Sequence, residues 1–149
     1  MNPLDLRSAL LAMHAQHVAL IHFPIALFLA SFACDPLARW RRDRNLATVA
    51  YYNLTAAAMA TLSAVVTGLI ARQWLLEGEE LRGDLRLHLL FGSLSAALIL
   101  LLWRWRARLR RSPERRLTAV YLAVALIAVF VVALTGHLGG ILSGVETPN

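Results

Sequence analysis

The chain has 149 residues, of which 58% are hydrophobic and only 16% are charged, with a mean hydropathy of +0.58. Because a soluble domain carries roughly 25% charged residues, this composition excludes a soluble multidomain enzyme. The apolar residues form continuous runs rather than the alternating short segments of barrel strands, which excludes an outer-membrane barrel. The one cysteine, Cys34, permits neither a disulfide within the chain nor a cysteine metal cluster.

Four stretches of the chain contain no charged residue, and each is long enough for one membrane crossing, which takes about 20 apolar residues. Short connections between such stretches favour antiparallel neighbours. We therefore predict one transmembrane domain over residues 1–149, an all-α integral membrane four-helix bundle with antiparallel up-down order. The predicted spans lie approximately at residues 16–37, 46–71, 87–104 and 117–139.

Two prolines bear on the shape of the first span. Pro24 cannot donate to the carbonyl of Leu20, so the helix either kinks there or begins nearby, after an interfacial segment over residues 4–13. Asp35, directly before Pro36, is expected to terminate the helix. The N-terminal residues lack the basic stretch and small-residue cleavage site of a secretory signal, so the span is expected to be retained.

The arginines are unevenly distributed over the three connections. Residues 39–44 hold four arginines against one acid, residues 104–116 hold seven against one, and residues 72–86 hold three against four. Short basic connections stay in the cytoplasm, which predicts an inner (cytoplasmic) membrane protein with both termini periplasmic. Trp40 and Trp103 flank the basic connections, as is typical of an interfacial aromatic belt with snorkelling arginines, and no nucleic-acid partner is expected.

Small residues recur at helical spacing in the second and third spans. Ala56, Ala60, Ala64 and Gly68 predict a smooth face along which another helix packs closely. A shorter face of this kind begins at Gly92 and leaves room for a homodimer contact. The pattern Thr-x-x-Tyr opens both the second and the fourth span, which favours two related helical hairpins.

All five histidines lie at the predicted outer ends of the spans, and they are the main candidates for a site. His22, His88 and His137 come from three different helices and are expected to share one site below the outer surface. Any two of them would supply the axial imidazoles of haem b, so the leading hypothesis is a small electron-transfer cytochrome. The residues expected to give the haem room or to meet its propionates are Gly136, Gly139, Gly140, Arg72, Arg82 and Arg86.

Other chemistries fit the same histidines. A non-haem copper or zinc site, or a membrane enzyme built on one, would use three or four imidazoles from His17, His22, His88 and His137. Without a metal, the histidines would relay protons or hold a quinone headgroup. A third hypothesis is a structural or accessory subunit in which the histidines only pack. No catalytic residue is identified, and the residues leave open whether the protein is an enzyme.

Three motifs surround these histidines. They are His-Val-Ala-Leu-Ile-His-Phe-Pro at residues 17–24, His88 shortly after an arginine, and Gly-His-Leu-Gly-Gly at residues 136–140. Over essentially the whole chain, these motifs resemble the bacterial four-helix membrane family named domain of unknown function 2231. Val18 stands where that family usually has proline, and Leu142-Ser143 replaces a usual apolar-aromatic pair. Similar domains occur joined to c-type cytochromes, so the resemblance implies redox chemistry by association.

Overall fold

A computed structural model of the chain describes residues 13–75, 83–111 and 117–143. This part of the chain contains helices and no strand, and each of the helices is long and apolar enough to cross a membrane. The prediction of an all-α membrane four-helix bundle is therefore confirmed. The helices are α2 (Met13–Arg41), α3 (Arg44–Leu75), α4 (Gly83–Arg111) and α5 (Ala119–Leu142).

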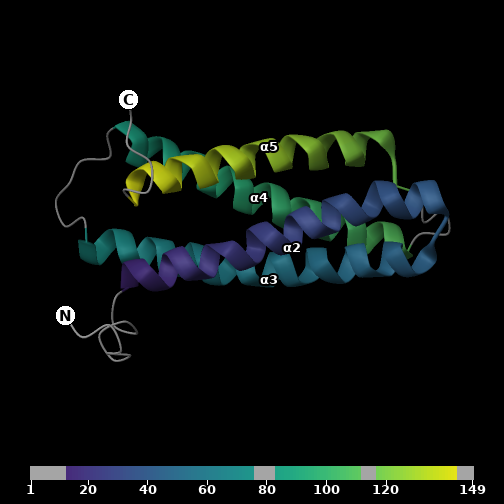
Figure 1. The fold of residues 1–149 in the computed structure, drawn as a ribbon, viewed down its shortest axis with the longest axis horizontal. Helices are drawn as coiled ribbons and strands as arrows, with labels where there is room; N and C mark the ends of the chain where they lie inside the picture. The colour runs from purple at the N-terminus through teal and green to yellow at the C-terminus, as the bar shows by residue number, and fades with distance from the viewer. Residues whose placement is uncertain (1–12, 76–82, 112–116, 144–149) are drawn as a thin grey trace.

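The four helices run antiparallel and form two helical hairpins (Figure 1). Helix α2 packs along α3, α4 packs along α5, and contacts between α3 and α4 join the two hairpins. The end of the bundle that holds His17 and His88 is called the histidine end below. The opposite end, which holds Arg39 and Arg106, is called the arginine end. Helices α2 and α4 begin at the histidine end, and α3 and α5 finish there.

The helices extend beyond the predicted spans. Helix α4 continues through the alternating arginines to Arg111, because arginine favours helices and its long side chain can reach out of the apolar layer. Helix α2 is continuous through both Pro24 and Pro36. The alternative in which the first helix begins near Pro24 is therefore wrong, since a proline removes one hydrogen bond and the surrounding turns persist. The expected interfacial segment over residues 4–13 lies, except for Met13, outside the described residues.

Side-chain caps set the points at which α3 and α5 begin at the arginine end. Asp43 Oδ1 accepts from the backbone N–H of Asn45 at 2.7 Å and of Leu46 at 3.3 Å. Thr118 Oγ1 accepts from the backbone N–H of Tyr121 at 3.1 Å. Caps of this kind satisfy helix N–H groups that have no partner within the helix.

Each helix contributes one large, almost fully buried side chain to the core. These are Phe28 of α2, Leu54 of α3, Leu102 of α4 and Tyr121 of α5, all no more than 2% exposed. Small alanines such as Ala57 and Ala128 fill the space between them, so the backbones can approach closely. The four helices are thus held in fixed positions around the two sites described next.

Candidate functional site

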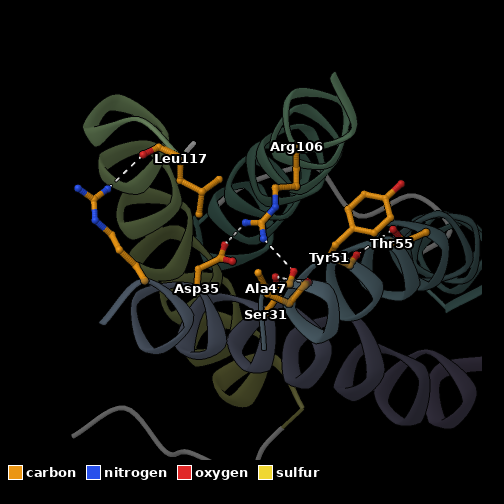
Figure 2. Close-up of polar contacts among 9 residues, drawn as sticks. Ser31, Asp35, Ala47, Tyr51, Thr55, Arg106 and Leu117 are labelled. Atoms are coloured by element: carbon orange, nitrogen blue, oxygen red, sulfur yellow. Dashed lines mark hydrogen bonds and ion pairs between the residues drawn. The ribbon is translucent and has the colours of Figure 1, made fainter. Parts of the chain in front are cut away.

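A buried ion pair joins the two hairpins at the arginine end (Figure 2). Arg106 Nη1 of α4 donates to Asp35 Oδ2 of α2, and Arg106 Nη2 donates to the carbonyl of Ala47 of α3 at 3.1 Å. The guanidinium carbon also lies 5.9 Å from the ring centroid of Tyr121 of α5. Arg106 therefore contacts a group from each of the other three helices while it is only 5% exposed.

The expectation that Asp35 terminates its helix is wrong. Helix α2 continues to Arg41, and Asp35 is buried one turn after Ser31, whose hydroxyl donates to the carbonyl of Ala50 at 2.8 Å. Nor does Arg106 snorkel to water as the basic connection suggested, because the carboxylate neutralises it inside the bundle. Asp35 Oδ1 is buried with no hydrogen-bond partner among the described residues.

Helical spacing carried a signal for this pair that the sequence interpretation missed. Residues two apart in a helix are rotated by about 200°, whereas residues four apart share a face. The run of arginines in α4 therefore occupies two opposite faces. Arg106 and Arg110 share one of them, and the guanidinium carbon of Arg110 lies 4.2 Å from the ring centroid of Tyr51 of α3. Arg106 is the buried arginine of this face, and Asp35 of α2 is the acid that neutralises it.

A cavity of about 870 Å³ opens between the hairpins at the histidine end. The pair of α2 and α3 and the pair of α4 and α5 diverge toward this end in Figure 1. Gly92 and Ala96 of the small-residue face of α4 line the cavity, and a Cβ added at Gly92 would lie 3.7 Å from Thr135 Cγ2 of α5. On α3, Ala56 of the predicted small face is exposed. Polar and charged residues also line the cavity: His17, Thr61, Arg72, His88 and Ser93.

The two cavity histidines are each held through Nδ1. His88 Nδ1 lies 3.2 Å from the carbonyl oxygen of Thr135, which can only accept, so Nδ1 carries the proton. His17 Nδ1 lies 3.2 Å from Thr67 Oγ1, which is also within hydrogen-bond distance of the carbonyls of Ser63 and Ala64. In the His88 ring the lone pair then belongs to Nε2, the tautomer in which metal-binding histidines are usually fixed by a second hydrogen bond.

Two glycines accommodate these imidazole rings. A Cβ added at Gly68 of α3 would lie 2.8 Å from Cε1 of His17, and one added at Gly139 of α5 would lie 3.2 Å from Cε1 of His88. Each histidine ring thus rests against the backbone of the partner helix in its own hairpin. Gly139, which is predicted to give a haem room, lies in the structure against the ring of His88.

The structure does not bring all the predicted site residues to this cavity. His22 is exposed, with Nδ1 2.7 Å from the carbonyl oxygen of Val18 in its own helix, and His137 is also exposed. Arg72 lines the cavity, whereas Arg86 is exposed and does not. The described residues contain no group of three His, Cys, Asp or Glu side chains placed to hold a metal ion. Gly136 is exposed and has open space around it, and Arg82 lies outside the described residues.

These features define a membrane-spanning four-helix protein with a buried ion pair at one end and a cavity lined by histidines at the other. The chain belongs to the family described as "Predicted membrane protein (DUF2231)", which matches residues 13–146. The family resemblance predicted from the histidine motifs is confirmed. No curated protein and no solved structure matches the chain.

Proposed function

We propose that this protein is a small b-type cytochrome that binds haem in the cavity at the histidine end, with His17 and His88 as the axial ligands. One observation carries the proposal. Two imidazoles from different hairpins line the same cavity, and the Nδ1 of each lies 3.2 Å from an oxygen of a threonine in the neighbouring helix. Haem in such a site would supply one-electron transfer.

The residues around the cavity fit this group. Its volume of about 870 Å³ falls within the roughly 300–1,000 Å³ of sites for small molecules and cofactors. Thr67 and the Thr135 carbonyl would hold the rings in orientation, as second hydrogen bonds do for metal-bound histidines. Arg72 lines the cavity and would meet a propionate.

The donor count favours haem over a non-haem metal. A copper or zinc site built from protein side chains alone would need at least three donors. The described part of the chain brings two histidines to the cavity and forms no group of three such donors. Two axial ligands are sufficient for haem.

The test is an absorption spectrum of the full chain purified in detergent, before and after reconstitution with haem and reduction with dithionite. We expect a bis-histidine spectrum that is lost in His17→Ala and in His88→Ala. His22→Ala and His137→Ala are matched controls, because these histidines are exposed and lie off the cavity, and their spectra should be unchanged. A chain that takes up no haem, or one whose spectrum survives loss of both His17 and His88, would contradict the proposal.

We further propose that the histidine end faces the periplasm in the bacterial inner membrane, because the short basic connections lie at the other end. In a Cys34→Ser background, Asp84→Cys at the histidine end should react with a membrane-impermeant thiol reagent on intact cells. Arg42→Cys at the arginine end should react only after the cells are broken. Both positions are exposed. The reverse pattern of labelling would show that the orientation is wrong.

A further inference from the structure

The alternating arginines near the end of α4 fall on two faces, and among the described residues only those on one face contact other helices. Arg106 pairs with Asp35, and Arg110 lies over the ring of Tyr51. Arg104 and Arg108 are four residues apart and so share the opposite face. Both are exposed, and within the described ranges no acidic side chain forms an ion pair with either.

Arg104 and Arg108 border a recess of about 430 Å³ on the outside of the bundle. Its other lining residues are Leu101, Trp105 and Leu109. The indole of Trp105 is fixed edge-on against Tyr121 of α5, with ring centroids 5.6 Å apart. The recess therefore has one rigid wall and two arginines on adjacent turns.

We propose that this recess binds the headgroup of an anionic glycerophospholipid. Guanidinium groups bind phosphate through paired, charge-assisted hydrogen bonds, and Arg104 and Arg108 have no competing acid in the described structure. Leu101 lies one turn deeper in the membrane and is 52% exposed, so it offers an apolar surface to the acyl chain. Trp105 lies between Arg104 and Arg108 along the helix, at the membrane interface where tryptophan is favoured.

The order of these residues along α4 favours a lipid over a soluble anion. From the middle of the helix outward, the recess presents leucine, then arginine and tryptophan, then arginine and a second leucine. The inner part of this order, leucine before arginine, matches the acyl chain and phosphate of a phospholipid. Net positive charge alone would attract any anionic surface, whereas this recess should select one lipid at one place.

The test measures lipid binding to the full chain in non-ionic detergent micelles, where no charged bilayer surface contributes. Phosphatidylglycerol or phosphatidylcholine is titrated in, and bound lipid is counted by native mass spectrometry. We expect binding of phosphatidylglycerol in preference to phosphatidylcholine. An arginine near an anionic headgroup is worth about a fivefold preference, so Arg104→Gln with Arg108→Gln should weaken phosphatidylglycerol binding roughly twentyfold.

The matched control is Arg41→Gln with Arg44→Gln, which removes the same charge from two exposed positions in the other basic stretch. It should change binding less than about twofold, since no recess is removed. Equal losses in the two double variants would overturn the proposal, as would equal binding of the two lipids. Displacement of the lipid by millimolar inorganic phosphate would also overturn it, because the site would then be a free-anion site.

Discussion

Replacing Arg106 with alanine should lower the free energy of unfolding by about 3–5 kcal/mol, because the change leaves the Asp35 carboxylate buried without its partner. Asp35 is only 4% exposed, and its Oδ1 has no hydrogen-bond partner among the described residues, so Arg106 at Oδ2 is the group that compensates the charge. The variant also frees the carbonyl of Ala47. Thermal or denaturant unfolding in detergent, followed by circular dichroism, measures the loss.

Two comparisons separate the ion pair from a general loss of arginine. Arg104→Ala removes the same side chain from the exposed face of the same helix and should change stability by no more than about 0.5 kcal/mol. The double variant Asp35→Leu with Arg106→Leu should cost less than the sum of the two single leucine changes, because no charge is left uncompensated. If the stability losses of the two single leucine variants simply added up in the double variant, Asp35 and Arg106 would not be coupled. Equal stability losses in Arg104→Ala and Arg106→Ala would also contradict the coupling.

Gly68→Ala should destabilise the protein by about 1–3 kcal/mol, the usual cost of overpacking a close contact. The added methyl group would lie 2.8 Å from Cε1 of His17, so the imidazole or the α3 backbone must move. Displacing His17 should also weaken haem binding in the spectroscopic test proposed above. The free energy of unfolding and the absorption spectrum of one purified variant provide both measurements.

Other glycines give a graded control for this effect. Alanine is normally better than glycine inside a helix by roughly 0.5–1 kcal/mol. Gly136→Ala should raise the free energy of unfolding by that amount, because nothing lies within 4 Å of the new methyl group. The stability change of Gly139→Ala should fall between those of Gly68→Ala and Gly136→Ala, since its methyl group would lie 3.2 Å from Cε1 of His88. A stabilised Gly68→Ala variant would contradict the close approach of His17 to α3.

The four helices could be predicted from sequence because a bilayer imposes both their length and their lack of charge. The ends of the helices could not be predicted. An arginine ends an apolar run in the sequence, but it does not end the helix. Asp35 shows the limit most clearly. A lone acid before Pro36 is typical of a helix end, and only its pairing with Arg106 of α4, 71 residues away, keeps it buried in the interior.

The candidate site was predicted in part, and helical rotation explains the difference. His17 and His22 are five residues apart, which places them about 140° apart around the helix, so they cannot both face one cavity. The same rule separates His137 from Gly139 by about 160°, and it is Gly139 that contacts the His88 ring. Of the predicted site histidines, His17 and His88 line the cavity, and His22 does not.

The contacts of Arg106 with all three other helices hold α4 in position at the arginine end. His88 lies 18 residues from Arg106 along α4, a distance of roughly 27 Å in a helix. A rotation of the helix by only about 6° around Arg106 would therefore move His88 by roughly 3 Å. A small change of helix tilt of this kind would alter the distance between the two cavity imidazoles without rearranging the buried ion pair.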